Sequence, residues 1–203
     1  FLIKPIEHVA DVVVYSATKF LSGHGNSVVG AIVDSGNFDY AKHPQRFKNF
    51  NEPDPSYHGL VYAVNLGVGS PFGANLSYIF KIRLTLLRDT GAAVSPFNAW
   101  LLSIGLETLS LRLERHISNA LSVATWLEKH AQVEKVNYAS LPSSKWHALA
   151  KKYSPKGSGA VLSFEIKGGI EAGKKFVEAL KLHSHVANIG DVRSLVIHPA
   201  STT

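Results

Sequence analysis

The 203-residue chain contains neither cysteine nor methionine. Without cysteine it can form no disulfide, no thiolate metal site and no cysteine nucleophile, so any redox chemistry requires a cofactor. The sequence shows no long uninterrupted apolar run and no basic start followed by an apolar stretch, which argues against membrane insertion and export and predicts a cytoplasmic protein. Because methionine is missing and Phe1 opens directly into apolar sequence, we expect an internal piece of a longer polypeptide.

Charge is also sparse. Charged residues make up 18% of the chain, and 21 basic against 15 acidic residues leave a formal net charge of +6. With 45% hydrophobic residues, the chain is expected to bury part of its surface against further chain or other subunits, which predicts a homo-oligomer. Lys and Arg are scattered rather than gathered in a basic stripe, so we expect no nucleic-acid partner.

The first third of the chain has the pattern of an α/β protein. The β-branched run ADVVVY at residues 10–15 predicts a strand buried on both faces of a parallel sheet. A second apolar run at residues 28–33 predicts the next strand. Residues 34–73 contain most of the Pro and Gly and predict a long irregular excursion, of the kind that is usually functional or interfacial.

Helical spacing of apolar residues returns at residues 76–87, and it is tightest between Leu106 and Leu127, where it predicts a long connecting helix. Beyond His130 short β-rich runs alternate with helical segments. These are the strands at 133–138 and 160–166 and the helices near 145–153 and 171–182. We therefore predict a boundary near Lys129. Residues 1–129 would be the C-terminal part of a large parallel-sheet domain with its connecting helix, and residues 130–203 an incomplete, smaller α+β domain.

Three polar residues follow the first predicted strand, where ligands bind in open α/β sheets. Lys19 can be kept neutral by desolvation and neighbouring positive charge, and a neutral amine attacks carbonyl groups. The hydroxyl groups of Ser16 and Thr18 are suited to donate hydrogen bonds to a phosphate. Pyridoxal 5'-phosphate needs both an amine for its aldehyde and donors for its phosphate. On spacing alone, however, a surface lysine at a strand end is the simpler interpretation.

The segment YSATKFLSGHG at residues 15–25 resembles the Schiff-base lysine motif of the Cys/Met-metabolism pyridoxal-phosphate enzymes. Four further segments resemble the O-acetylhomoserine sulfhydrylase branch of that family: EPDPSYHG at 52–59, LLRDTGAAVSPFNAWLL at 86–102, GLETLSLRLERH at 105–116 and ANIGDVRSLVIHPASTT at 187–203. The resemblance spans essentially the whole chain. It implies an aspartate-aminotransferase-like (type I) fold, a homotetramer, and an enzyme of methionine biosynthesis that joins O-acetylhomoserine to sulfide or a thiol.

The resemblance also implies roles for individual residues. Lys19 would form the Schiff base and shuttle protons, and Ser16 and Thr18 would bind the cofactor phosphate. Ser194 matches a serine that helps to hold the substrate carboxylate. Arg193 stands where cystathionine-forming and cystathionine-cleaving relatives often have a glutamate, which favours a small anionic or inorganic sulfur nucleophile over cysteine. A surface salt bridge is an equally good interpretation of Arg193.

Other interpretations remain open at this point. Within the family they are a γ-lyase and a cystathionine-forming enzyme. From a different class, the chain fits a catalytically inactive structural or binding fragment, because the family's phosphate-binding glycine turn, stacking aromatic ring, pyridinium-binding aspartate and carboxylate-binding arginine lie outside residues 1–203. His183 and His185 have the spacing of metal ligands on a strand, but no third ligand is near them in sequence, so we predict no metal site.

Overall fold

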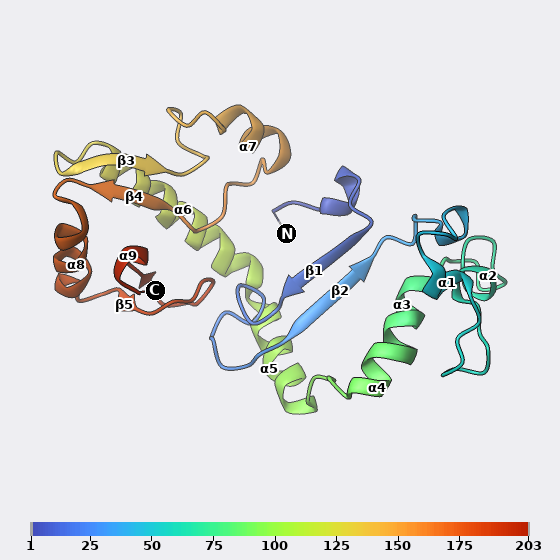
Figure 1. Cartoon of the computed structure of the whole chain (residues 1–203). Helices are drawn as coiled ribbons and strands as arrows, with labels where there is room; N and C mark the ends of the chain where they lie inside the picture. Colours follow the sequence, from blue (N-terminus) through green and yellow to red (C-terminus); the bar gives the residue numbers. More distant parts are fainter. Residues whose placement is uncertain (1, 203) are drawn as a thin grey trace. The chain divides into compact units, whose positions relative to one another are not determined.

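The computed structural model describes residues 2–202, which form two compact units (Figure 1). Residues 2–3, 16–30 and 96–202 belong to the first unit. Lys4–Tyr15 and Ala31–Ser95 form the second unit. All residues with predicted catalytic or binding roles belong to the first unit.

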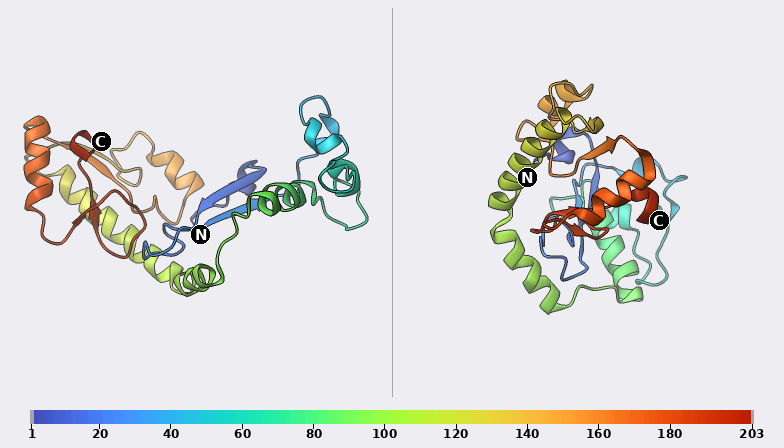
Figure 2. Two further views of the ribbon diagram at one scale, coloured as in Figure 1. Left: turned by 60° about the horizontal axis from the view of Figure 1, so that its bottom comes forward. Right: turned by 90° about the vertical axis from the view of Figure 1, so that its left-hand side faces the viewer.

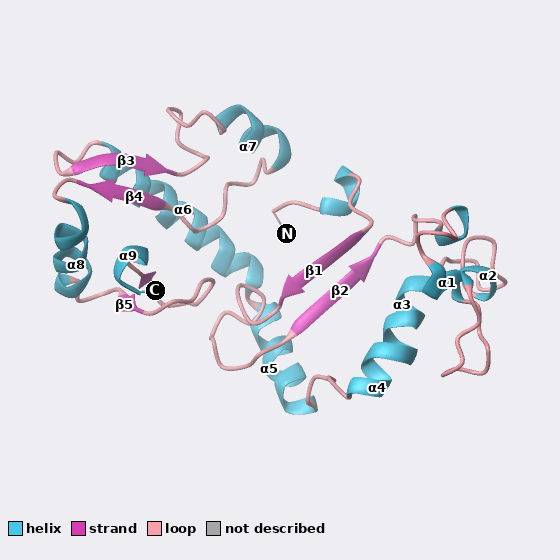
Figure 3. Ribbon diagram, in the orientation of Figure 1, coloured by secondary structure: helices cyan, strands magenta, loops and turns pink. Residues whose placement is uncertain are grey.

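The second unit is built from short elements, which Figure 3 shows joined by long loops. Apart from most of the first two strands, which are described below, they are η1 (Pro5–His8), η2 (Tyr40–Lys42), α1 (Lys48–Asn51), α2 (Tyr62–Asn65), α3 (Ser77–Lys81), the π-helical η3 (Ile82–Leu87) and α4 (Arg88–Thr90). An aromatic cluster forms their core. The rings of Tyr40 and Phe50 stack with centroids 4.1 Å apart, and Tyr62, which is fully buried, and Leu66 complete the cluster. The predicted irregular excursion therefore has a hydrophobic core of its own.

One buried carboxylate, Asp54, connects this core to two helices. It accepts hydrogen bonds from the backbone N–H and the hydroxyl of Ser56, from Tyr62 Oη, from Lys81 Nζ at 3.0 Å and from Thr85 Oγ1. The bonds from Ser56 and Lys81 hold the pKa of Asp54 well below its usual range, although burial opposes them. Since the ion pair with Lys81 is almost fully desolvated, losing either partner would leave an uncompensated buried charge.

Strands β1 (Val12–Ser16) and β2 (Gly30–Asp34) lie where the sequence predicts strands. They form a two-stranded sheet, and their arrows point in opposite directions in Figure 1. The prediction that β1 is buried on both faces of a parallel sheet is wrong for the described residues. Within residues 2–202 β2 is the sole strand that pairs with β1, and the faces of β1 are incompletely covered: Val12 and Val13 are half-buried and Val14 is 71% exposed.

The first unit contains the two longest helices, α5 (Pro96–Glu107) and α6 (Leu109–Glu128). The chain then continues through β3 (Val133–Asn137), α7 (His147–Tyr153), β4 (Ser163–Ile166), α8 (Gly169–Ala179), β5 (Ser184–His185), β6 (Leu195–Val196) and α9 (Pro199–Thr202). Strands β3 and β4 pair antiparallel, and β5 and β6 pair parallel. Figure 2 shows β3 and β4 beside α6. There, Ala120 and Ala124 of α6 form a buried cluster with Tyr138 and Leu141.

The predicted elements beyond residue 76 are confirmed within a few residues of their ends. The long helix differs in one respect, since it is interrupted at Thr108 between α5 and α6 although the leucine spacing continues. The predicted domain boundary near Lys129 follows directly after the end of α6 at Glu128, and it stays a prediction. None of the helices in the described part of the chain is long and apolar enough to span a membrane.

Candidate active site

Lys19 lies in a helical turn that directly follows β1. Strand β1 ends at Ser16, whose carbonyl accepts a hydrogen bond from the Lys19 N–H at 3.2 Å. The N–H of Ser22 then bonds to the Ala17 carbonyl at 3.0 Å, and the N–H of Gly23 bonds to the Lys19 carbonyl at 2.8 Å. These bonds fix the backbone on both sides of Lys19. We call residues 17–23 the lysine turn.

The Lys19 ammonium group donates a hydrogen bond to the side-chain oxygen of Asn188. Asn188 comes from the loop between β5 and β6, and this loop packs directly on the lysine turn. Gly190 has φ +75°, and a Cβ atom there would lie 2.5 Å from the backbone nitrogen of Phe20. The N–H of Val192 donates to the Gly23 carbonyl at 2.8 Å. The lysine side chain is thus half-buried between two loops with a defined partner.

The two hydroxyl groups predicted to bind phosphate are in different situations. Thr18 Oγ1 accepts a hydrogen bond from the Val29 N–H at 2.9 Å and lies 3.3 Å from the Val29 carbonyl. Its hydrogen can turn to another acceptor while the bond from Val29 persists. Ser16 is exposed, and within residues 2–202 no group bonds to its hydroxyl. Both hydroxyls are therefore able to donate to an added anion.

Arg193 forms a salt bridge with Asp191. The Nη2 atom of Arg193 lies 3.2 Å from Asp191 Oδ2, and its backbone N–H donates to Oδ1 at 2.8 Å. The hydrogen bond from the Arg193 side chain lowers the pKa of the buried Asp191, and the same bond raises the pKa of Arg193. The salt-bridge interpretation of Arg193 is thus confirmed. The guanidinium remains 68% exposed, so the pair leaves it accessible to a ligand.

Ser194 is exposed directly before β6, where its carbonyl accepts a hydrogen bond from the Ser184 N–H at 2.9 Å. It follows Arg193 directly, and six residues separate it from Asn188, which contacts Lys19. The segment 188–194 therefore contains the partner of Lys19 together with both predicted substrate-binding residues.

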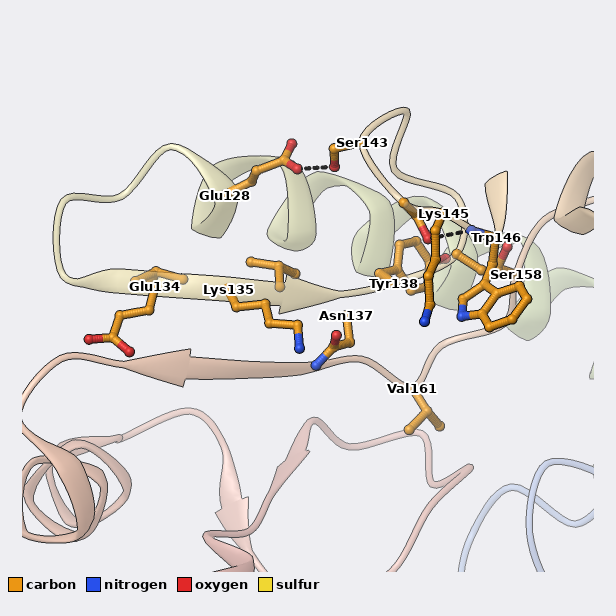
Figure 4. Close-up of a pocket in the computed structure, with 14 residues that line it drawn as sticks. Glu128, Glu134, Lys135, Asn137, Tyr138, Ser143, Lys145, Trp146, Ser158 and Val161 are labelled. Carbon is orange, nitrogen blue, oxygen red and sulfur yellow. Dashed lines mark hydrogen bonds between the residues drawn. The ribbon is translucent and has the colours of Figure 1, made fainter. Parts of the chain in front are cut away.

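A pocket of about 940 Å³ lies elsewhere in the first unit (Figure 4). It is lined by residues of β3 and of the segment that leads to α7, among them Lys135, Asn137, Lys145 and Trp146. None of the predicted site residues lines this pocket. The candidate active site is instead an open region around the lysine turn.

The residues around Lys19 fit pyridoxal 5'-phosphate. They comprise an amine that is half-buried but has no carboxylate ion-pair partner in residues 2–202, and two hydroxyls able to donate to a phosphate. Where the chain is described, no group of three or more His, Asp or Glu side chains is arranged to hold a metal ion. His183 and His185 belong to no such group.

Sequence reasoning missed Asn188 and Asp191. Both belong to the segment ANIGDVRSL, but only Arg193 and Ser194 were singled out there. The one available signal was Gly190 directly before Asp191, since a glycine next to a polar residue is typical of a tight loop that approaches another backbone closely. It does not reveal which loop is approached.

Comparison with known proteins shows similarity to one enzyme family over the full length of the chain. The family described as Cys/Met metabolism PLP-dependent enzyme matches residues 1–203. An O-acetyl-L-homoserine sulfhydrylase of Leptospira meyeri is 54% identical, with 100% of this chain and 46% of that protein covered. A homocysteine synthase of Schizosaccharomyces pombe is 52% identical with the same coverage. The chain thus spans a little under half the length of these relatives.

Solved structures agree with the sequence comparison. An O-acetylhomoserine (thiol)-lyase of Campylobacter jejuni, solved with N'-pyridoxyl-lysine-5'-monophosphate, matches with a TM-score of 0.87 at 42% identity, over 100% of this chain and 47% of that one. A cystathionine gamma synthase of Xanthomonas oryzae pv. oryzae in complex with cystathionine matches with a TM-score of 0.73 at 32% identity, over 98% of this chain and 41% of that one. These matches confirm the predicted type I fold class. The chain belongs to the Cys/Met metabolism PLP-dependent enzyme family.

Proposed function

We propose that the protein containing this chain catalyses γ-replacement on O-acetylhomoserine, with sulfide or a thiol as nucleophile and pyridoxal 5'-phosphate as cofactor. The observation that supports it most directly is the position of Lys19, half-buried after a strand end with its amine bonded to a neutral amide. Two relatives named O-acetyl-L-homoserine sulfhydrylase, 54% and 50% identical, and one named homocysteine synthase, 52% identical, support the choice of reaction.

The reaction balances without a further reagent. The Cγ–O bond of O-acetylhomoserine breaks and acetate leaves with the bonding electrons, while a Cγ–S bond forms to hydrosulfide. The products are homocysteine and acetate, or methionine and acetate when the nucleophile is methanethiolate. Bound pyridoxal 5'-phosphate supplies an electron-withdrawing ring that makes the α-proton of the amino acid acidic.

Within this chain, Lys19 would hold the cofactor aldehyde covalently in the resting enzyme and afterwards move protons at Cα and Cβ of the substrate. Asn188 accepts a hydrogen bond from the amine and so keeps Nζ in one place without adding a charge. Thr18 and Ser16 would donate hydrogen bonds to the phosphate. Ser194 would donate to the substrate carboxylate.

Arg193 would favour hydrosulfide over a zwitterionic amino acid as nucleophile. Its exposed guanidinium attracts a small anion, whereas its pairing with Asp191 limits the net positive potential at this point. The preference is therefore expected to be modest.

Three further features are part of the proposal. The complete protein would be a cytoplasmic homo-oligomer, with the tetramer expected from the family. Its large cofactor-binding domain would end near Lys129, and residues 130–203 would belong to the smaller domain. Methionine biosynthesis is the role that fits a homocysteine-forming reaction.

Borohydride reduction of the cofactor-loaded full-length protein, followed by peptide mass mapping, tests the site. The expected result is one pyridoxyl adduct, on Lys19. An adduct on a different lysine would refute the assignment, and the lack of any adduct would favour the inactive structural or binding fragment.

Product analysis separates the reactions. With O-acetylhomoserine and sulfide we expect homocysteine and acetate. A γ-lyase would instead release ammonia and a 2-oxo acid at the same rate without sulfide, and a cystathionine-forming enzyme would prefer cysteine to sulfide.

A further inference from the structure

The end of the lysine turn leaves two backbone carbonyl groups without partners in the turn itself. The last carbonyls of any helical turn lack the N–H groups that would follow in a longer helix. Here they belong to Phe20 and Leu21. Both accept hydrogen bonds from one guanidinium group, because Arg112 Nη1 donates to the Phe20 carbonyl at 2.9 Å and Nη2 donates to the Leu21 carbonyl at 3.3 Å.

Arg112 is itself held in a fixed orientation. It lies in the first turn of α6, where its Nε donates to Thr108 Oγ1 at 3.1 Å and its Nη2 donates to the Gly105 carbonyl at 2.6 Å. No carboxylate in residues 2–202 forms an ion pair with it. Burial lowers the pKa of this guanidinium, so the group is partly desolvated and depends on the carbonyl oxygens.

Two glycines leave the space that this arrangement needs. A Cβ atom at Gly23 would lie 2.4 Å from Arg112 Nη1, and the residue has φ +79°, a conformation that favours glycine. A Cβ atom at Gly105 would lie 2.2 Å from the Ser22 carbonyl oxygen. Helix α5 and the guanidinium therefore approach the lysine turn at distances that only glycine permits.

We propose that Arg112 is a positioning residue for Lys19: it caps the C-terminal carbonyls of the lysine turn and so fixes the backbone from which the Lys19 side chain extends. The inference rests on the proposed function, since it takes Lys19 to be the lysine that holds the cofactor. Arg112 does not touch the reacting atoms. A purely structural role in joining α5 to α6 is the competing explanation.

Hydrogen exchange in the cofactor-free full-length protein tests the cap. Arg112→Gln should accelerate exchange of the Ser22 and Gly23 amides by about tenfold or more, because bonds from a charged donor to the turn are lost. Thr108→Val removes the bond that orients the guanidinium, together with the long bond from Thr108 Oγ1 to the Gly105 carbonyl, but keeps both bonds to the lysine turn, so it should have a smaller effect in the same peptide. Arg115→Gln, an exposed position on the same helix, should leave exchange unchanged.

The second measurement is the fraction of bound cofactor that borohydride fixes on Lys19. It should fall at least about threefold in Arg112→Gln. In Arg112→Ala, millimolar methylguanidinium should restore it, because the added ion can occupy the vacated space and bond to both carbonyls. Lysine reaches only one carbonyl, so Arg112→Lys should restore less than half of the loss.

The outcomes distinguish the possibilities. Unchanged exchange in residues 17–23, or acceleration that is equal in α5, α6 and β3, would overturn the positioning role and leave the proposed function intact. Lack of a pyridoxyl adduct in the unaltered protein would overturn the proposed function instead. If Arg112→Gln does not fold, Thr108→Val decides: faster exchange confined to the lysine turn supports the cap, and unchanged exchange refutes it.

Discussion

The amine of Lys19 and the side-chain amide of Asn188 are hydrogen-bonded although 169 residues separate them in the sequence. The amine is therefore held in place by a hydrogen bond to a neutral group and not by an ion pair.

Lys19→Ala in the full-length protein should abolish γ-replacement but leave part of the cofactor bound through its phosphate. The amine that forms the covalent link and moves the protons is lost, whereas the hydroxyls of Ser16 and Thr18 remain. Turnover and cofactor content after gel filtration measure the two effects. Lys151→Ala, at an exposed position on α7, is the matched control and should behave like the unaltered protein.

Asn188→Asp should lower the fraction of cofactor that borohydride fixes on Lys19 by about two- to fivefold at neutral pH, because a carboxylate at this position would hold the ammonium group in an ion pair. Asn119→Asp adds the same charge at an exposed position on α6 and should leave this fraction unchanged. An unchanged fraction in Asn188→Asp would mean that the Lys19 contact is not kept in solution.

Ser16→Ala and Thr18→Val should each weaken cofactor binding by about 1–3 kcal/mol, the effect of losing a hydrogen bond to a charged group. Thr18→Ser keeps the hydroxyl and should retain most of the affinity. Equilibrium dialysis of the cofactor gives the dissociation constants. A double variant with unaltered affinity would contradict the phosphate role of both residues.

Arg193→Gln should lower the rate with sulfide relative to cysteine by about two- to fivefold, since an exposed charge discriminates only weakly. Initial rates with both acceptors at one ionic strength give the ratio, and added salt should reduce the difference between the two proteins. Arg193→Lys keeps the charge and should leave the ratio close to its original value. If the ratio of the two rates is the same in Arg193→Gln as in the unaltered protein, Arg193 does not influence the choice of nucleophile.

Asp54→Asn should destabilise the second unit by about 3–5 kcal/mol at pH 7, because it leaves Lys81 buried without its counter-ion. The depressed pKa of Asp54 stabilises the folded state above the unfolded pKa near 3.8, and this contribution is lost as the pH falls through the folded value. Acidification from pH 6 to pH 3 should therefore reduce the protection of residues 54–66 against hydrogen exchange. The reduction should be larger in the unaltered protein than in Asp54→Asn.

Hydrogen exchange is the suitable measurement for this prediction, because all three tryptophans lie outside the second unit. Asp89→Asn removes an exposed carboxylate of the same unit and serves as the control. Equal protection of all three proteins at pH 6 would show that the bonds to Asp54 do not stabilise the unit.

Local features of this structure follow from the sequence, whereas long-range ones do not. The position of Lys19 could be predicted because a β-branched strand and the residues after it are adjacent in the chain. Helix α6 could be predicted because its apolar residues recur at helical spacing. The break at Thr108 could not, since the leucine spacing continues across it.

The same distinction applies to the site. The roles of Ser16 and Thr18 were suggested by their neighbourhood to Lys19, and they remain predictions. The contacts of Asn188 and Arg112 with the lysine turn have no local pattern, because each joins segments that are more than 90 residues apart. The burial of β1 was overestimated because the composition of a strand indicates that it can be buried, not which elements cover its faces.

The packing of the loop 188–192 on the lysine turn also sets an order of events during synthesis. The turn leaves the ribosome 169 residues before its partner loop, which at translation rates of about 5–20 residues per second is a delay of roughly 10–30 s. Arg112 emerges 92 residues after Phe20, so it can cap the turn in the later part of that interval, while the amine of Lys19 still has no Asn188 to bind. The nascent chain can therefore complete α5 and α6 before its reactive centre, which forms when residues 188–194 have emerged.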